Sequence, residues 1–271
     1  MSLRWLFLAF LPLTGMGLQA HTLIGHDIEA LLIPDLGTLQ VKDTLSLPEG
    51  QDEWTFVLHQ GLDPQVVAGQ ARLASLGSQD GREVFRLSLQ GSEPITLAYA
   101  GKLQGELQTA EEGMGRSRQW SEGIISRDGV VLDGNSGWYP LFPDSLQRFS
   151  LQVALPDDWI AISQGAGPNR TMTPEGASMK WSEGQPQDDI YLIAAPFVTY
   201  TQPTARGEAQ VYLRKPDPEL AQRYLDATAD YLALYSDLIG PYPYAKFALV
   251  ENFWETGYGM PSFTLLGPQV I

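Results

Sequence analysis

VENFWETGYGMPSFTLLG, residues 250–267, is the stretch that decides how the C-terminal part of the chain folds. It continues an apolar run over residues 247–250, which predicts a strand. Three turn-forming residues, two glycines and a proline, then fall within residues 257–261. On spacing alone, the stretch therefore predicts a strand followed by a tight turn.

A helix is predicted directly upstream, over residues 218–239, because apolar residues recur there at helical spacing. Asp217 is suited to cap its start, and Pro218 fits the first helical position. Gly240 and Pro241 are typical of a helix end. With strand candidates on both sides, the strand–helix–strand order predicts an α/β domain that begins near residue 206.

The residues before this helix alternate between apolar and polar in short runs, which predicts half-buried antiparallel strands. Turn-forming segments separate these runs, and residues 109–119 and 165–176 are expected to be loops. We therefore predict a mainly β fold, with an antiparallel β-sandwich or saddle-like sheet domain over residues 21–205. The alternating positions include Leu39, Val41, Leu45, Trp54, Phe56, Leu58, Phe85, Leu87, Leu89, Phe149, Leu151 and Val153.

Composition excludes several classes of function. The chain has 271 residues and a formal net charge of -15, which opposes nucleic-acid binding and docking on anionic lipid. It has no cysteine, so disulfides, thiolate zinc sites and cysteine nucleophiles are excluded. Acidic pairs such as Asp188-Asp189 are expected to lie in solvated turns.

The first twenty residues resemble a secretory signal peptide. Arg4 supplies a positive start, residues 5–13 form a short apolar run, and Ala20 is a small residue suited to cleavage. The apolar run is too short to span a bilayer. We expect residues 1–20 to direct the protein to the periplasm or outside the cell, with no stable membrane span.

The three histidines are His21, His26 and His59, and their spacing does not predict a zinc site. A metallopeptidase site needs two His one helical turn apart with a third ligand and a general base. His21 and His26 are expected on opposite faces of a strand, as ordinary surface or edge residues. Cleavage after Ala20 would make His21 the N-terminus, and its amine and imidazole could then hold copper together with a second His. Nothing else in the chain supports such a copper site.

Several segments, taken in order, resemble the aminopeptidase N family of zinc peptidases, the gluzincins. In that family a Gly-x-Met-Glu-Asn-like motif lies shortly before a His-Glu-x-x-His helix. Gly259-Met260 resembles the first part of this motif and is the most specific match. The supporting segments, which together cover most of the chain, are residues 129–140, 149–164, 188–197 and 231–244.

The resemblance implies the N-terminal portion of an exported zinc metallopeptidase, followed by the beginning of a thermolysin-like α/β catalytic domain over residues 206–271. No His-Glu-x-x-His helix follows Gly259-Met260, so the chain is expected to be truncated before the zinc site. Zinc and a peptide substrate are therefore implied for the full-length family. For this chain no catalytic residue, metal ligand or bound zinc is expected, and the incomplete domain is expected to promote association.

The resemblance also implies a substrate-binding segment made of Tyr258, Gly259, Met260, Pro261 and Ser262. In the family this strand runs along the substrate and hydrogen-bonds to it. Family aminopeptidases carry a Glu after the Met, and it holds the free amine of the substrate. Pro261 stands at that position here, and a proline neither pairs with an ammonium nor donates a backbone hydrogen bond.

A second hypothesis is a secreted β-sandwich module that binds glycans or peptides through aromatic platforms. This hypothesis requires tryptophans that face solvent, whereas buried tryptophans favour the peptidase scaffold. The helix over residues 218–239 already argues against a pure sandwich. The candidate platform residues are Trp54, Trp120, Trp138, Trp159 and Trp181.

Overall fold

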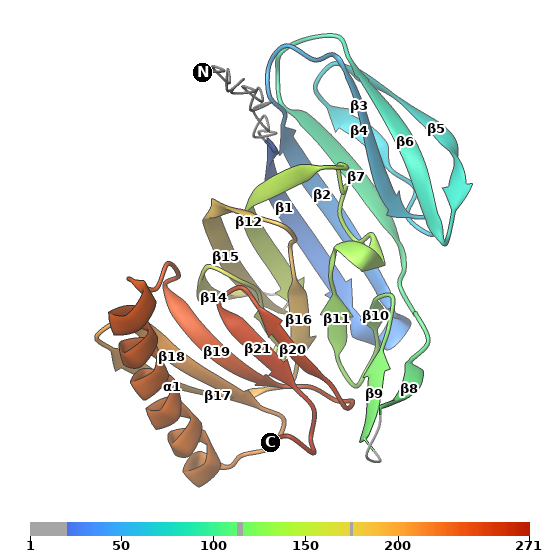
Figure 1. The fold of residues 1–271 in the computed structure, drawn as a ribbon. Helices are drawn as coiled ribbons and strands as arrows, with labels where there is room; N and C mark the ends of the chain where they lie inside the picture. The colour runs from blue at the N-terminus through green and yellow to red at the C-terminus, as the bar shows by residue number, and fades with distance from the viewer. Residues whose placement is uncertain (1–20, 113–115, 174–175) are drawn as a thin grey trace, which may run out of the picture.

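The computed structural model describes residues 21–112, 116–173 and 176–271. The prediction of a mainly β fold is confirmed, because strands dominate the described chain and pair into several largely antiparallel sheets (Figure 1). The predicted signal peptide, residues 1–20, lies outside the described residues.

A seven-stranded sheet forms the centre of the molecule, and two of its neighbouring strands, β1 and β12, come from distant parts of the chain. β1 pairs in parallel with β12, and the other neighbours pair antiparallel. In sheet order the strands are β14 (Ala166–Thr173), β15 (Gly176–Gln187), β12 (Ser145–Leu155), β1 (Thr22–Ile33), β2 (Thr38–Ser46), β7 (Ile95–Lys102) and β4 (Gln65–Ala68).

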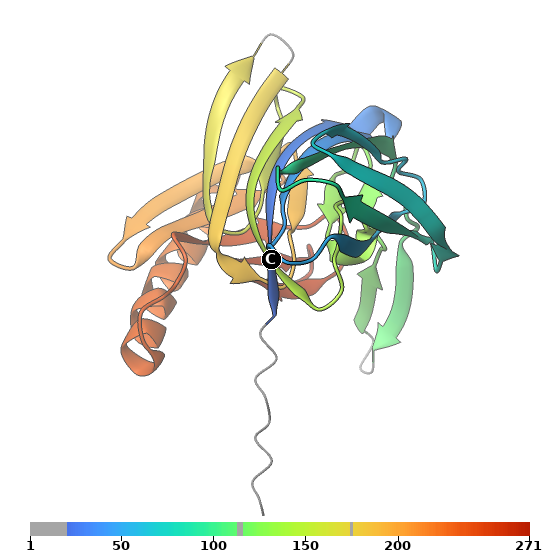
Figure 2. The same ribbon diagram turned by 90° about the horizontal axis from the view of Figure 1, so that it is seen from above.

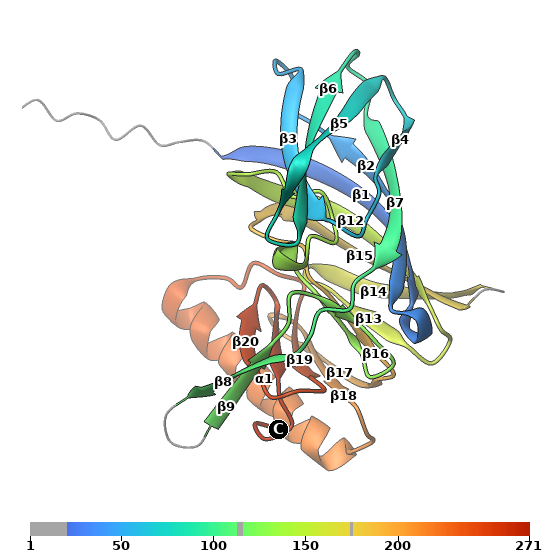
Figure 3. The same cartoon turned by 90° about the vertical axis from the view of Figure 1, so that its right-hand side faces the viewer.

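Three smaller sheets surround this centre. The four-stranded sheet contains β10 (Ile124–Ile125), β11 (Val130–Leu132), β16 (Leu192–Ala195) and β13 (Ile160–Ile162). The three-stranded sheet contains β3 (Glu53–His59), β6 (Arg82–Leu89) and β5 (Ala71–Gln79). β8 (Gln108–Glu112) and β9 (Arg116–Trp120) form a hairpin that projects from the body in Figure 3. Two 3-10 turns are η1 (Pro34–Leu36) and η2 (Gly134–Ser136).

The two predicted loops are wrong. Residues 109–119 fall largely in the β8–β9 hairpin, and residues 165–176 contain β14. The long hairpin of β14 and β15 extends beyond the rest of the molecule in Figure 2. Because most side chains of β14 are exposed, this strand needs no alternation of apolar and polar residues, and the sequence pattern carries no strand signal there.

The alternating apolar residues of the sequence do form the core. Phe56, Leu58, Phe85 and Leu87 of the three-stranded sheet are buried in the same cluster as Leu151 of the central sheet. Phe56 and Phe85 stack with their ring centroids 5.4 Å apart. Period-two alternation therefore identified the buried face of each of these strands correctly.

The C-terminal part builds a five-stranded sheet and one long helix. α1 (Pro218–Ile239) connects two parallel strands, as the strand–helix–strand pattern predicted. The Asp217 carboxylate accepts a hydrogen bond from the backbone N–H of Leu220 at 2.9 Å, which confirms the predicted cap. The strands, in sheet order, are β17 (Val198–Thr204), β18 (Gly207–Leu213), β19 (Lys246–Glu251), β21 (Phe263–Leu266) and β20 (Gly257–Met260).

The middle strands of the five-stranded sheet, β18, β19 and β21, are covered on both faces. On one face, Val211 and Leu249 pack with Leu225 of α1, and Figure 1 shows α1 lying along that face. On the other face, Val250 and Phe263 belong to the main core. β17 already belongs to this sheet, although it precedes the domain boundary predicted near residue 206. That boundary stays a prediction.

One side of α1 has no partner among the described residues. Its C-terminal half exposes a stripe of large apolar side chains, with Leu238 68% and Ile239 84% exposed. The other members of this apolar stripe are Tyr231, Leu234 and Tyr235. Within the described residues, no helix combines the length and the apolar character needed to cross a membrane.

We expect the apolar stripe to drive self-association, because contiguous exposed apolar surface favours contact between molecules. Replacing Leu238 with Gln should shift the chain towards the monomer in light scattering as the protein concentration rises. The matched control is Leu36→Gln in η1, where a leucine of similar exposure (58%) stands apart from the stripe. Equal association of the wild type and both variants would contradict this expectation.

Candidate functional site

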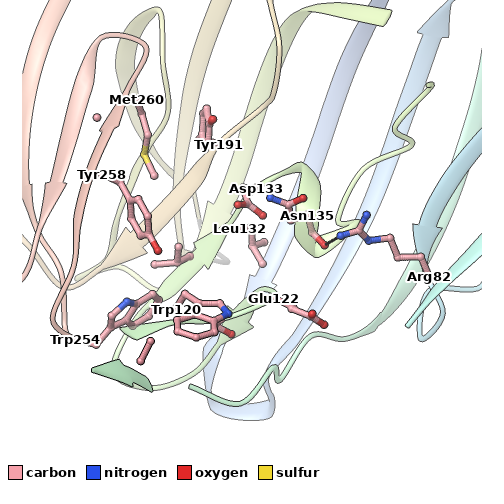
Figure 4. Close-up of a pocket in the computed structure, with 14 residues that line it drawn as sticks. Arg82, Trp120, Glu122, Leu132, Asp133, Asn135, Tyr191, Trp254, Tyr258 and Met260 are labelled. Atoms are coloured by element: carbon pink, nitrogen blue, oxygen red, sulfur yellow. Dashed lines mark hydrogen bonds between the residues drawn. The ribbon is translucent and has the colours of Figure 1, made fainter. Parts of the chain in front are cut away.

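A cleft of about 640 Å³ lies where the β8–β9 hairpin, the four-stranded sheet and β20 meet (Figure 4). Its walls come from elements that are far apart in the sequence, so it exists only because the sheets pack together. The residues that line it are Arg82, Ala110, Trp120, Ser121, Glu122, Val131, Leu132, Asp133, Asn135, Tyr191, Trp254, Tyr258, Gly259 and Met260.

The cleft has an aromatic side and a polar side. In Figure 4, Trp120, Trp254 and Tyr258 gather on one side, while Glu122 and Arg82 lie towards the other. The Arg82 guanidinium donates a hydrogen bond to the backbone carbonyl of Asn135 at 2.7 Å, which fixes the arginine against η2. The cleft therefore offers apolar ring surface and charged groups of both signs to a ligand.

The backbone of β20 borders this cleft with one edge unpaired. β20 is the last strand of its sheet, and among the described residues it pairs only with β21. The N–H of Gly267 donates to the carbonyl of Thr256 at 2.8 Å, which makes these two a hydrogen-bonded pair. Bonded and non-bonded pairs alternate along an antiparallel ladder. Met260 therefore directs its backbone groups to β21, whereas Gly257 and Gly259 direct theirs to the open edge.

No side chain of the described residues obstructs the space beside the two glycines of this edge. A Cβ atom built on Gly257 or Gly259 would meet no atom within 4 Å. Both glycines thus leave room beside the strand for another backbone to approach. The hydroxyl of Thr264 donates to the carbonyl of Tyr258 at 3.0 Å and ties the strand to β21 from within the sheet.

The structure divides the five residues that the sequence predicted for substrate binding. Tyr258, Gly259 and Met260 line the cleft. Pro261 lies in the turn between β20 and β21 and is half-buried. Ser262 is buried and has a φ of 66°, a left-handed conformation that disfavours residues other than glycine. Its hydroxyl accepts hydrogen bonds from the amine of Lys246 at 2.8 Å and the N–H of Gly165 at 3.2 Å.

Asp189 lies behind the cleft and stabilises its wall through hydrogen bonds. Its carboxylate accepts hydrogen bonds from the N–H of Gly134 at 2.9 Å, the hydroxyl of Tyr139 at 2.9 Å and its neighbour's N–H, that of Ile190, at 2.6 Å. Burial, together with the nearby charge of Asp133, raises the pKa of Asp189 to about 6, although the three hydrogen-bond donors act to lower it. The expectation that Asp189 lies in a solvated turn is wrong.

Several cleft residues were missed at the sequence level. Arg82, Glu122 and Asp133 carry no motif or spacing, and only the packing of three sheets brings them together.

Lys246 begins a strand of apolar residues, where a charged side chain would be expected at the surface. Its burial follows from the double-sided packing of the five-stranded sheet, which sequence periodicity alone does not report.

The histidines do not form a metal site. His26 is buried, not at the surface as expected, and its ring nitrogens contact Asp43 Oδ2 at 2.7 Å and Gln147 Oε1 at 3.1 Å. Both nitrogens are thus engaged within the central sheet. Among the described residues, no group of three or more His, Asp or Glu side chains is placed to hold a metal ion. The residues present therefore do not fit a zinc ion.

The aromatic platforms of the glycan-binding hypothesis are absent from most of the predicted positions. Four of its five tryptophans are buried in the core, and only Trp120, in the cleft, is half-buried. The indole N–H of Trp138 donates to the carbonyl of Ile190 and that of Trp181 to Ala161, so these two are satisfied inside the protein. The glycan-binding alternative is not favoured. The buried four are Trp54, Trp138, Trp159 and Trp181.

Comparison with solved structures finds a similar fold in zinc peptidases at low sequence identity. An M1 zinc metallopeptidase from Deinococcus radiodurans aligns over 91% of this chain and 59% of its own, with a TM-score of 0.62 and 17% identity. A mutant of that enzyme bound to a Tyr-Ser-Ala substrate aligns with a TM-score of 0.61 and 15% identity, over 91% of this chain and 60% of its own. Native LTA4 hydrolase from yeast aligns over 93% of this chain and 41% of its own, with a TM-score of 0.61 and 13% identity.

These comparisons establish the fold. This chain spans no more than about three-fifths of the length of each of those structures. No protein-family model matches the sequence. No curated protein matches it either. The likeness to zinc metallopeptidases therefore rests on the arrangement of the strands and the helix.

We expect Asp189 to make stability fall as the pH rises from 4 to 7. Its folded pKa of about 6 exceeds the unfolded value of 3.8, so the folded state binds the proton more tightly between these values. The contribution is present in full below pH 4 and is lost as the pH passes 6. A shift of this size corresponds to roughly 2–3 kcal/mol in the free energy of unfolding.

The measurement compares denaturant unfolding of the wild type and Asp189→Asn at each pH. The stability of the wild type relative to the variant should decline between pH 4 and pH 7, because Asn does not titrate. Asp188→Asn is the matched control for the loss of a carboxylate at this place in the chain, since the side chain of Asp188 is exposed next to Asp189. A difference that stays flat or rises for Asp189→Asn would overturn the assignment.

Proposed function

We propose that this chain is the substrate-positioning part of a zinc-peptidase-like hydrolase and that it binds an extended peptide along β20. The observation that carries this proposal is the open edge of β20 beside the cleft, where Gly257 and Gly259 present unpaired backbone groups. The fold shared with the M1 zinc metallopeptidases supports it, because one of these was solved with a peptide substrate.

Pairing with a strand edge explains how a site with few side-chain contacts can bind peptides of different sequences. The backbone of the peptide would supply donors and acceptors to the free groups of Gly257 and Gly259. Alternate side chains of the peptide would then point into the cleft, towards Trp120 and Tyr258 on one side and Glu122 on the other. Tyr258, Gly259 and Met260 are thus proposed as the contact residues, with Pro261 and Ser262 shaping the turn that follows.

The hydrolytic step is not assigned to any residue of this chain. Zinc, as named for the similar structures, would supply a bound water activated for attack on the peptide bond. The described residues provide no ligand set for it, so ligands and a general base would have to come from elsewhere. What this chain contributes is the alignment of the peptide and the shape of the cleft.

We also propose that the protein is exported. The support is the sequence of residues 1–20, in which a positive residue, Arg4, precedes an apolar run and a small residue, Ala20. Detection of a mature form that starts at His21 in an extracellular or periplasmic fraction would test this proposal. An intact N-terminus in the cytoplasmic fraction would contradict it.

Gly259→Pro should weaken peptide binding without unfolding the protein. Proline removes the N–H that faces the open edge, and no hydrogen bond inside the sheet is lost. We expect the dissociation constant for the tripeptide Tyr-Ser-Ala, measured by calorimetry or NMR titration, to rise by about tenfold, since one backbone hydrogen bond contributes roughly 1 kcal/mol and the ring adds steric hindrance.

The matched control is Gly259→Ala, which keeps the N–H and adds a methyl group into open space. This variant keeps the backbone hydrogen bond to the peptide, so it should lose less affinity for the tripeptide than the proline variant does. Equal binding by the proline variant would show that the peptide does not pair with β20. Wild-type protein that binds no peptide at any concentration would refute the proposed function itself.

Blocking the amino group of the peptide should change its affinity little. Pro261 lies where family aminopeptidases carry a Glu, and a charge-assisted bond to the amine would contribute roughly 1.5–3 kcal/mol, or one to two decades in affinity. We therefore expect Tyr-Ser-Ala and its N-acetyl form to bind with similar affinities. A strong preference for the free amine would contradict this, and Glu122→Gln would then show whether that cleft carboxylate is responsible.

A further inference from the structure

Lys246 is a charged side chain sealed inside the protein. It is 1% exposed and begins β19. Its amine donates hydrogen bonds to the carbonyl of Ser163 at 2.9 Å, the carbonyl of Ser262 at 3.1 Å and the hydroxyl of Ser262 at 2.8 Å. A protonated amine has three N–H donors, and all three find an oxygen acceptor here.

The surroundings of this amine come from two different parts of the fold. Ser163 directly follows β13, and Trp181 belongs to β15 of the central sheet; the amine lies 5.1 Å from the centroid of the Trp181 ring. Ser262 lies in the turn between β20 and β21, and Phe263 begins β21, with its ring centroid 5.0 Å from the amine. One side chain therefore bridges the β domain and the hairpin that carries β20.

Burial of the amine is costly unless its contacts are kept. Burial lowers the pKa of Lys246 well below its ordinary value, and the charge of Glu183 on β15 acts against that shift. An unpaired amine in this position would lose its hydration without compensation. The arrangement is stable only while Ser163 and Ser262 remain in place, so the lysine restricts where the turn can lie.

We propose that Lys246 and Ser262 form a latch that positions the β20–β21 hairpin against the β domain and so sets the alignment of the peptide-binding edge. Lys246 is then a positioning residue, since it does not line the cleft. Its relevance to peptide binding rests on the proposed function, whereas the latch itself does not.

The geometry of the turn explains why a latch is needed. Ser262 holds a φ of 66°, and a residue with a side chain adopts this conformation only when its surroundings enforce it. The enforcing contacts are the two bonds from Lys246 and the N–H of Gly165, which donates to the Ser262 hydroxyl. Met260 lies two residues earlier and lines the cleft, so a displaced turn would shift the edge of β20 directly.

The test measures backbone amide hydrogen exchange in the full chain for the wild type, Lys246→Met, Ser262→Ala and the double variant. Methionine keeps the apolar stem against Trp181 and Phe263 and removes the donors. We expect exchange in β20 and β21 to speed up by about tenfold or more in Lys246→Met, and exchange in β1 and β12 to change by less than about twofold. The exposed Lys215→Met is the control and should change neither region.

The double variant tests whether the two residues act together. If they form one latch, adding Ser262→Ala to Lys246→Met should speed exchange by less than the product of the single effects. Ser262→Ala should also shift the NMR resonance of the Lys246 amine. Multiplicative effects, or acceleration spread evenly over β1 and β12, would overturn the latch and leave only a packing role. If Lys246→Met does not fold, Ser262→Ala alone tests the latch, through hydrogen exchange in β20 and β21 and through the NMR resonance of the Lys246 amine.

A binding arm separates this proposal from the proposed function. Tyr-Ser-Ala should bind Lys246→Met more weakly than Lys215→Met, because a loosened edge has to be reordered on binding. If the wild type binds no tripeptide but exchange in β20 still responds to Lys246→Met, the latch stands and the proposed function fails. If the wild type binds and Lys246→Met binds equally well with unchanged exchange, the latch fails and the proposed function stands.

Discussion

The packing of the middle strands of the five-stranded sheet on both faces is the constraint on which the rest of the structure depends. Val211 and Leu249 face α1, while Tyr212 and Val250 face the main core, so neighbouring residues of one strand serve two different contacts. A strand that is covered on both faces has no solvent-facing side, so its sequence does not alternate between apolar and polar residues. The sheet is thereby clamped between the helix and the β domain, and the outer strand β20 is carried to the cleft with an unpaired edge.

The cleft is a product of that clamping and has no motif of its own. Trp120 arrives from the hairpin, Asp133 from the start of η2, and Tyr258 from the sheet edge. Contacts behind the surface keep these walls in place. The backbone N–H of Gln119 donates to the carbonyl of Glu255 at 3.0 Å, and Asp189 holds the N–H of Gly134. Rigid walls around an open strand edge favour ligands that are themselves extended.

The sequence predicted what local chemistry determines. Asp217, Pro218 and Gly240 gave the limits of α1, because caps and proline act on the adjacent backbone. Alternation located the buried faces of the strands. It could not show that His26, Lys246 and four of the five platform tryptophans are buried, since burial of a polar or aromatic side chain depends on partners distant in sequence. The same applies to the exposed β14, whose pairing needs no apolar pattern, and to Ser262, whose side chain turns away from the cleft.

The parallel pairing of β1 with β12 has a consequence for the order of assembly. Ile24 and Ile28 are fully buried, yet the strand beside them, around Gln147 and Leu151, is made more than a hundred residues later. A chain emerging from its N-terminus can pair β1 with β2 at once, but the other edge of β1 must wait. Pairing over so long a separation is slow, because the intervening chain must first be brought into a closed loop. During that interval the backbone edge of β1 is open to any other strand, so the incomplete chain is exposed to wrong pairing until β12 has been made.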